Sequence, residues 1–309
     1  MHIHIVTPVA LDATNGNRHT ADQYAAVFRA LGHEVTLAQS GKQATLPPAD
    51  TLIAIHAEKS HQDIVAFKQQ YPSNRCMVVA GTDVYVDQLS AATVESIEVA
   101  DVLVTLQHKA TEQIPEAARG KAVTIFQSFE TPSEKVARMD DGFFNIAVVG
   151  HLRAVKDPMR AAAAVRLLPE TSKVRVQHVG EILEPEFESL VEAEMAENPR
   201  YTWLGGLNAN ASQALIGSCQ LLVHSSLAEG GPRVIGEAVV AGTPILASRI
   251  DGITGTLGDD YPGYFEPKGT EELAALIQRA ETDQGFYEAL KTAIADRAPR
   301  FDPALERAA

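Results

Sequence analysis

The 309-residue sequence contains only two cysteines, Cys76 and Cys219. They lie far apart in the chain, and neither belongs to a CxxC pair or to a Cys/His pattern of the metal-binding kind. This spacing excludes a disulfide framework and the usual zinc motifs. We therefore expect both cysteines to be small apolar core residues of a protein in a reducing compartment.

Positive charge is also scarce. The chain has 26 Lys and Arg residues against 40 Asp and Glu residues, which gives a formal net charge of −14. Such an acidic chain is a poor ligand for a polyanion, so we expect no nucleic-acid partner. A local basic pocket for a single phosphate group remains compatible with this composition.

Long apolar runs are absent as well, since none approaches the roughly 18 residues that a membrane-spanning helix needs. The N-terminal segment MHIHIVTPVA has the pattern of a short strand rather than that of a signal peptide. We expect a soluble cytoplasmic protein with no membrane partner. The composition, 45% hydrophobic and 21% charged, is typical of a globular protein, and the length predicts about two domains.

The dominant pattern in the sequence is an alternation of short apolar strands and helices. The strands are apolar at consecutive positions, as in LIAI and MVVA, which is typical of parallel strands covered on both faces. The predicted strands are His2–Thr7, Glu34–Gln39, Thr51–His56, Met77–Ala80, Val102–Leu106, Ala122–Gln127, Asn145–Val149, Val174–Val179, Tyr201–Trp203, Leu221–Ser225 and Pro244–Ala247. The predicted helices are His19–Leu31, His61–Gln70, Gln88–Val99, Pro158–Leu168, Glu186–Ala196, Ala211–Ile216, Pro232–Ala241, Glu271–Ala280 and Phe286–Ala298.

This alternation predicts an α/β protein of two doubly wound, Rossmann-like domains that face a cleft. The segment Phe129–Phe144 interrupts the pattern with a proline, several charges and a glycine, so it is expected to link the domains. The predicted boundaries are 1–138 and 139–290. Residues 291–309 form a helical tail that can return to the first domain.

The densest motif follows the predicted strand Leu221–Ser225. Gly230 and Gly231 allow the backbone to approach a ligand closely, and Pro232 is expected to start a helix whose first amides suit a phosphate or sugar oxygen. Glu229 precedes the glycines and Glu237 lies in the second turn of the helix. Two carboxylates at this place suit sugar hydroxyls better than a phosphate.

A second motif, GHLRAVKDP at 150–158, follows the predicted strand Asn145–Val149. Arg153 and Lys156 lie three residues apart, before a helix that Pro158 is expected to open. Their charges could neutralise a diphosphate that backbone dipoles alone would leave partly uncompensated. Because this arrangement needs no metal and no metal-ligand spacing is evident, we expect no metal and no cofactor.

Two weaker signals lie in the N-terminal half. The segment Gly16–Thr20 places small polar residues and an arginine where a helix opens, which is typical of an anion-binding turn. The segment Gly81–Tyr85, GTDVY, follows another predicted strand. Asp83 from this segment and His56, which ends a strand, are candidates for orienting an acceptor or a sugar.

The motifs together carry a resemblance to known enzymes. Glu229 and Glu237, eight residues apart around Gly-Gly-Pro, resemble the E-x7-E motif of retaining, family 4-like glycosyltransferases with the GT-B fold. With GNRHTA at 16–21, GTDVY and GHLRAVKDP, the chain closely resembles the selenosugar synthases of selenoneine biosynthesis. The resemblance runs from Met1 to about the last helix.

This resemblance implies a UDP-sugar donor, UDP-GlcNAc or UDP-glucose, and selenophosphate as the acceptor, joined through a carbon–selenium bond. It implies that the first domain binds the acceptor and the second binds the donor. The catalytic residues would be Arg153, Lys156, Glu229, His56 and Asp83. The donor-binding residues would be Gly180, Leu204, Gly230, Gly231, Pro232, Arg233, Val234 and Glu237. The acceptor-binding residues would be Gly16, Asn17, Arg18, Thr20 and Thr82.

Other functions share these sequence features. A GT-B hexosyltransferase with another small acceptor, a UDP-sugar epimerase and a non-catalytic UDP-sugar-binding protein are the alternatives. No GxGxxG motif follows a predicted strand, which argues against a dinucleotide-dependent dehydrogenase. Either hexose, either anomeric outcome and any oligomeric state agree with these residues.

Overall fold

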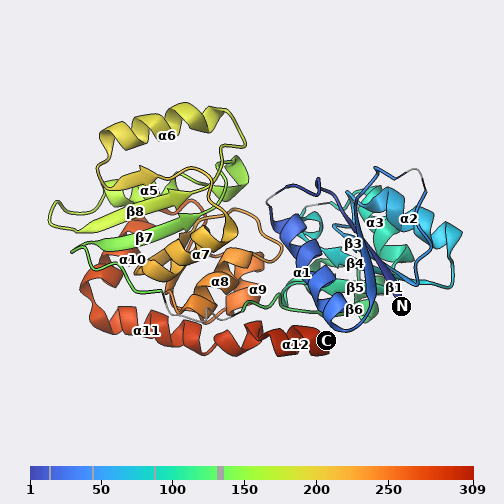
Figure 1. Cartoon of the computed structure of the whole chain (residues 1–309). Coiled ribbons are helices and arrows are strands. Elements are labelled where there is room, and N and C mark those ends of the chain that lie inside the picture. The colour runs from blue at the N-terminus through green and yellow to red at the C-terminus, as the bar shows by residue number, and fades with distance from the viewer. Residues whose placement is uncertain (14, 44, 87, 131–135) are drawn as a thin grey trace. The chain divides into compact units, whose positions relative to one another are not determined.

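The structure, a computed structural model, describes residues 1–309 except 14, 44, 87 and 131–135. By their contacts, the residues divide into two compact units. The first unit comprises Met1–Gln127, Glu229–Pro232 and Glu306–Ala309; the second comprises Ser128–Ala228 and Arg233–Leu305. Each unit contains a six-stranded parallel sheet with helices packed against it, which confirms the predicted α/β fold (Figure 1).

The sheet of the first unit has the strand order β2-β1-β3-β4-β5-β6, and every neighbouring pair is parallel. Its strands are β1 (His2–Thr7), β2 (Glu34–Gln39), β3 (Thr51–Ile55), β4 (Arg75–Ala80), β5 (Val102–Thr105) and β6 (Ala122–Thr124). Its helices are α1 (Gly16–Ala30), α2 (His61–Gln70), α3 (Ala91–Val99) and α4 (Ala110–Gln113), with short 3₁₀ turns η1 (Thr82–Val84) and η2 (Glu116–Lys121).

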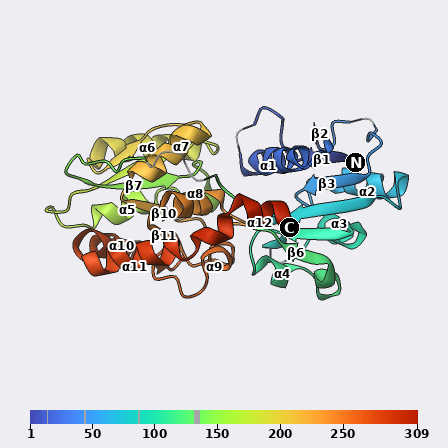
Figure 2. The ribbon, with the colours of Figure 1, turned by 60° about the horizontal axis from the view of Figure 1, so that its bottom comes forward.

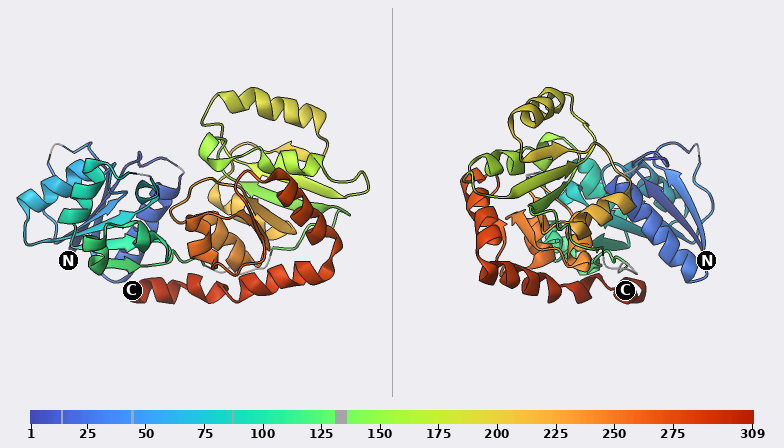
Figure 3. Two further views of the ribbon diagram at one scale, coloured as in Figure 1. Left: turned by 180° about the vertical axis from the view of Figure 1, so that it is seen from behind. Right: turned by 60° about the vertical axis from the view of Figure 1, so that its left-hand side comes forward.

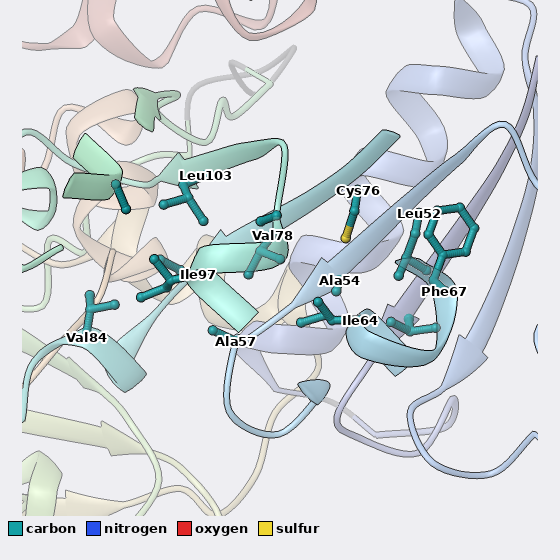
Figure 4. Packing of buried hydrophobic residues seen from close by; sticks show 14 of the residues in the cluster. Leu52, Ala54, Ala57, Ile64, Phe67, Cys76, Val78, Val84, Ile97 and Leu103 are labelled. Atoms are coloured by element: carbon teal, nitrogen blue, oxygen red, sulfur yellow. The ribbon is translucent and has the colours of Figure 1, made fainter. Parts of the chain in front are cut away.

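The helices of the first unit bury both faces of its sheet. Helix α1 covers one face, and helices α2 and α3 cover the other (Figure 2). Leu52 and Ala54 of β3 pack into one core with Phe67 of α2, whereas Ile53 and Ile55 pack into the other core, on the side of α1 (Figure 4). The consecutive apolar residues of the strands therefore serve two cores, as the sequence pattern predicts.

The sheet of the second unit has the order β12-β11-β10-β7-β8-β9. Its strands are β7 (Phe144–Val149), β8 (Val174–Val179), β9 (Tyr201–Trp203), β10 (Leu221–His224), β11 (Ile245–Ser248) and β12 (Tyr264–Phe265). Its helices are α5 (Arg160–Arg166), α6 (Glu186–Glu197), α7 (Ala209–Ser218), α8 (Arg233–Ala241), α9 (Asp251–Leu257), α10 (Thr270–Thr282) and α11 (Gln284–Ala295), with 3₁₀ turns η3 (Ala154–Lys156) and η4 (Ala298–Phe301). Helices α7 and α8 lie on one face, and α5 and α10 on the other (Figures 1 and 3). A last helix, α12 (Pro303–Ala308), ends the chain.

The prediction that the linker begins at Phe129 is wrong. Phe129 is buried, and its ring centroid lies 6.0 Å from that of Phe301. A Cβ atom at Gly236 of α8 would collide with the ring of Phe129, so the glycine makes room for it. Phe129 is therefore a core residue of the second unit. Pro132 lies outside the described residues.

The two cysteines are buried and unbridged, as predicted. Burial raises the pKa of each thiol to about 12, so both are poor nucleophiles. Among the described residues, no helix combines the length and the apolar character needed to cross a bilayer.

Candidate functional site

A pocket opens at the carboxyl ends of β7, β8 and β10 in the second unit. Open parallel sheets bind ligands at this end of their strands. The pocket is lined by Val148, Val149, Gly150, Lys156, Pro158, His178, Val223, His224, Ser225 and Ser226. Lys156 is the residue of this lining that the sequence singled out for a phosphate-binding role.

Arg153 lies in the loop that follows β7, immediately before the 3₁₀ turn η3. Its Nε atom is buried and has no hydrogen-bond partner among the described residues. A buried charged donor without a partner is costly, because it has lost water and gained nothing in exchange. The guanidinium therefore has a donor available for an anionic ligand.

The end of this loop is held by its neighbours. The Ser225 hydroxyl donates to the backbone oxygen of Asp157 at 2.9 Å. Arg160 donates from Nε and Nη2 to the Asp157 carboxylate at 2.7 and 3.1 Å, and from Nη1 to the Thr270 hydroxyl. Asp157 itself has φ of 45°, in the left-handed region. These contacts place Lys156, directly before Asp157, in a fixed backbone.

The predicted helix start at Pro158 is wrong. Asp157 takes a left-handed conformation after the η3 turn, and regular helix α5 begins only at Arg160. The left-handed Asp157 separates the η3 turn from the helix, and Met159, with φ of −89° and ψ of 0°, is the N-cap residue, so regular helix begins only after it. The predicted start of the later helix at Pro232 is wrong by one residue, since α8 begins at Arg233.

Gly180, expected to bind the donor, follows β8 beside the loop of Arg153. A Cβ atom there would collide with the carbonyl oxygen of Gly150, so only glycine lets the two loops meet. Trp203 Nε1 donates to the Gly180 oxygen at 2.8 Å. Leu204, a second expected donor contact, has a side chain that is exposed, and its amide donates to the His178 oxygen at 2.8 Å.

His178 is a pocket residue that the sequence analysis missed. It is fully buried, with Nδ1 2.8 Å from the Tyr201 hydroxyl and Nε2 3.0 Å from the Gly150 oxygen. Burial lowers its pKa to about 4. Ser225, predicted as the last residue of a strand, was not assigned to the site. Both lie at the end of a parallel strand, which is the signal that could have identified them.

In α8, the predicted residues Arg233 and Glu237 lie one turn apart. Arg233 Nη2 is 4.0 Å from Glu237 Oε1, and its guanidinium lies 4.9 Å from the centre of the Phe129 ring. Burial raises the pKa of Glu237, and the charge of Arg233 opposes that shift. Val234, between them, is half-buried.

The preceding predicted segment, Glu229–Pro232, is grouped by its contacts with the first unit. Glu229 is buried. Gly230 and Pro232 are also buried, and Gly231 is half-buried. Regular helix begins after this segment, at Arg233.

His56 and Asp83, the candidates for orienting a substrate, lie together in the first unit. Asp83 is buried, and its two carboxylate oxygens accept the amides of Ala57 and Gly81, each at 2.6 Å. His56 Nδ1 is 3.6 Å from Asp83 Oδ2, and His56 has φ of 73°, rare for a residue with a side chain. Burial lowers the pKa of His56, whereas the nearby carboxylate of Asp83 raises it; the net direction is down.

The expected acceptor segment forms the first turn of α1. Asn15 caps this helix by accepting the Arg18 amide at 3.2 Å. Arg18 pairs with Asp22 through Nη2 at 2.7 Å and Nε at 2.9 Å, while its Nη1 is buried without a partner among the described residues. Arg18 thus keeps one donor for a ligand. Gly16 and Asn17 are the first two residues of the helix.

Thr20 and Thr82 are placed differently from each other. The Thr20 hydroxyl donates to the Gly16 oxygen at 2.9 Å and accepts from Gln127 Nε2 at 2.7 Å. Its proton is therefore committed within the first unit. Thr82 starts the short turn η1 after β4 and is exposed to solvent.

No group of three or more His, Cys, Asp or Glu side chains in the described part of the chain is arranged to hold a metal ion.

Comparison with known proteins gives the family. The sequence model of "Glycosyl transferases group 1" matches residues 129–297, more than half of the chain. This chain belongs to that family. A search of curated proteins found no match.

Solved structures give the fold of this group 1 glycosyl transferase. Anabaena HepE in complex with UDP-glucose has a TM-score of 0.78 at 16% identity, over 100% of this chain and 98% of HepE. Sucrose-phosphate synthase from Thermosynechococcus elongatus has a TM-score of 0.76 at 16% identity, over 98% and 94%. The lipopolysaccharide outer core galactosyltransferase WaaB has a TM-score of 0.69 at 15% identity, over 100% and 97%. The fold is GT-B, as the sequence motifs predict.

Proposed function

We propose that this group 1 glycosyl transferase transfers a hexose from a UDP-sugar, UDP-GlcNAc or UDP-glucose, to selenophosphate. The product contains a new carbon–selenium bond and is a precursor of a selenosugar. Membership of the family supports sugar transfer. The GT-B neighbour HepE was solved with UDP-glucose, which supports a UDP-linked donor. The motifs in both halves of the chain support selenophosphate as the acceptor.

One observation carries the donor assignment. Arg153 has a buried Nε without a partner among the described residues, in the same loop as Lys156, which lines the pocket. Two cations, one of them with an unused buried donor, suit a ligand with several negative oxygens. The diphosphate of a UDP-sugar is such a ligand. Glu237, Arg233 and Val234 of α8 are proposed to contact the rest of the nucleotide, and Glu229 and the two glycines the sugar.

The proposed reaction is a substitution at the anomeric carbon. The selenium lone pair forms a bond to C1 while the bond from C1 to the diphosphate oxygen breaks, and its electron pair leaves on UDP. Negative charge grows on the β-phosphate, where Arg153 and Lys156 would stabilise it more strongly in the transition state than in the ground state. Selenium is a soft nucleophile, so no base is needed to remove a proton.

The acceptor is proposed to bind in the first unit. Arg18 would bind the phosphoryl oxygens through its unused Nη1, in the helix turn that begins with Gly16 and Asn17. His56 would hydrogen-bond a substrate oxygen. Asp83 would act by holding His56, because both of its carboxylate oxygens accept backbone amides.

The test is to incubate the protein with each UDP-sugar and freshly prepared selenophosphate. We expect UDP release and a sugar product with the selenium isotope pattern in the mass spectrum. UDP release with a different acceptor, and none with selenophosphate, would instead identify another hexosyltransferase. Binding of the UDP-sugar without turnover on any acceptor would identify a binding protein.

A further inference from the structure

The side chain of His178 connects three strands of the second unit. It projects from β8, contacts the Tyr201 hydroxyl on β9 through Nδ1 at 2.8 Å, and contacts the Gly150 carbonyl oxygen after β7 through Nε2 at 3.0 Å. A carbonyl oxygen only accepts, so Nε2 must carry the ring proton in this contact. Nδ1 of the neutral ring then accepts the proton of the Tyr201 hydroxyl.

Burial keeps this ring neutral. No surface of His178 is exposed, and its pKa falls to about 4, so the imidazole is uncharged at neutral pH. The Tyr201 side chain is also buried, and its ring lies edge-on to the imidazole at 6.0 Å between centroids. Both nitrogens of the ring are thus committed to fixed partners.

The Gly150 carbonyl is the first acceptor of the loop that carries Arg153 and Lys156. The Gly150 amide donates to the Val179 oxygen at 2.9 Å, so the β8 backbone and the His178 side chain together bind both backbone polar groups of Gly150. Two residues later, the Leu152 amide donates to the Glu181 oxygen at 2.8 Å. The backbone is therefore fixed up to the residue before Arg153.

We propose that His178 is a positioning residue of the donor site, which through its bonds to Gly150 and Tyr201 holds Arg153 in place for the diphosphate. It does not touch the reacting atoms. Without its imidazole, the Gly150 oxygen and the Tyr201 hydroxyl lose their partner. The loop then has no side chain from β8 to fix its first turn. A shift of about 1 Å in a binding group can cost about 100-fold.

The inference rests on the proposed UDP-sugar donor, and it distinguishes contacts to the diphosphate from contacts to the nucleoside. The probes are UDP and uridine, and the measurements are their dissociation constants by calorimetry and the melting temperature. We expect His178→Leu to weaken UDP binding about 10- to 100-fold and to change uridine binding by no more than about 2-fold. His178→Gln, whose amide can donate to Gly150 and accept from Tyr201, should stay within about 3-fold for UDP.

His178→Asn provides a second comparison if His178→Leu fails to fold. The asparagine side chain is too short to reach both partners. The affinity for UDP should therefore be about 10-fold lower than in His178→Gln, and the affinity for uridine should not change. Equal UDP affinities of the folded variants and the wild type would overturn the inference, as would an equal loss for UDP and uridine. A wild-type protein that binds neither UDP nor a UDP-sugar would instead overturn the proposed function.

Discussion

In the first unit, the guanidinium of Arg18 meets the carboxylate of Asp22 at 2.7 Å, one helical turn away. In the second unit, the side chain of Arg153 has neither a hydrogen bond nor an ion pair with any described residue. The charge of Arg18 is thus partly compensated before a ligand arrives, whereas that of Arg153 is not. A compensated cation suits reversible capture of a small anion, and an uncompensated one suits charge that grows during a reaction.

The largest effect is expected at Arg153. Arg153→Ala should lower kcat by about 10²- to 10³-fold, because it removes the group proposed to stabilise the leaving diphosphate. Arg166→Ala is the matched control, since Arg166 is an exposed arginine of the same unit that pairs with Glu194. Steady-state kinetics of both variants checks this. Near-normal turnover of Arg153→Ala would place the diphosphate elsewhere.

Acid should destabilise the second unit through His178. Its pKa of about 4 in the folded state lies below the ordinary value of 6.5, so the unfolded chain binds the proton first as the pH falls. The stabilisation is complete above pH 6.5 and is lost between pH 6.5 and 4, by up to about 3 kcal/mol. Urea unfolding across this range should show a flatter pH dependence for His178→Gln than for the wild type.

The control for this pH dependence is His108→Gln, at an exposed position of the first unit. It should follow the wild-type curve. If the free energy of unfolding depends on pH in the same way for His178→Gln and the wild type, the protonation of His178 is not the cause of the destabilisation by acid.

Variants of Arg18 and Asp22 test the role of the arginine whose charge is already paired. Arg18→Ala should raise KM for selenophosphate about 10- to 150-fold and leave UDP affinity unchanged, since a charge-assisted contact contributes about 1.5–3 kcal/mol. Asp22→Asn should act in the opposite direction and lower this KM, because it removes the competing carboxylate. A loss of both UDP and selenophosphate binding in Arg18→Ala would assign the segment to the donor.

The smallest effect is expected at Glu237. Glu237→Ala should weaken UDP about 10-fold with little change in kcat, because a ribose contact is alike in ground and transition states. Glu229→Ala should instead lower kcat with little change in UDP affinity. Calorimetry with UDP, beside kinetics, separates the two. Equal losses of UDP affinity would overturn this division of roles.

Most of the fold could be predicted from local patterns. Runs such as Leu52–Ile55 are apolar at each position, and that pattern indicates a strand buried on both faces. Helix α9 (Asp251–Leu257) and strand β12 (Tyr264–Phe265) were missed. The helix contains two glycines, and the strand has only two residues, so neither carries a clear period; tertiary packing determines both.

Charge and spacing drew attention to Arg153 and Lys156, and the structure places Lys156 in the pocket lining and Arg153 in the same loop. The site could not be predicted where a side chain acts through a backbone group. His178 contacts the carbonyl oxygen of Gly150, 28 positions earlier in the chain, and the pairing of β7 with β8 brings the two residues together. Asp83 was selected from the sequence, but the structure shows that both of its carboxylate oxygens accept backbone amides, which the sequence could not reveal.

The tight approach of Gly180 to Gly150 also limits how the enzyme could be altered. The loops after β7 and β8 share hydrogen bonds in both directions, including a bridge from Leu152 to Ile182, and a side chain at position 180 would force them apart. If only one of these loops were replaced by that of another transferase, the new loop would not fit the loop that remains. If these loops bind the donor as proposed, a change of donor preference should require both loops to be exchanged together.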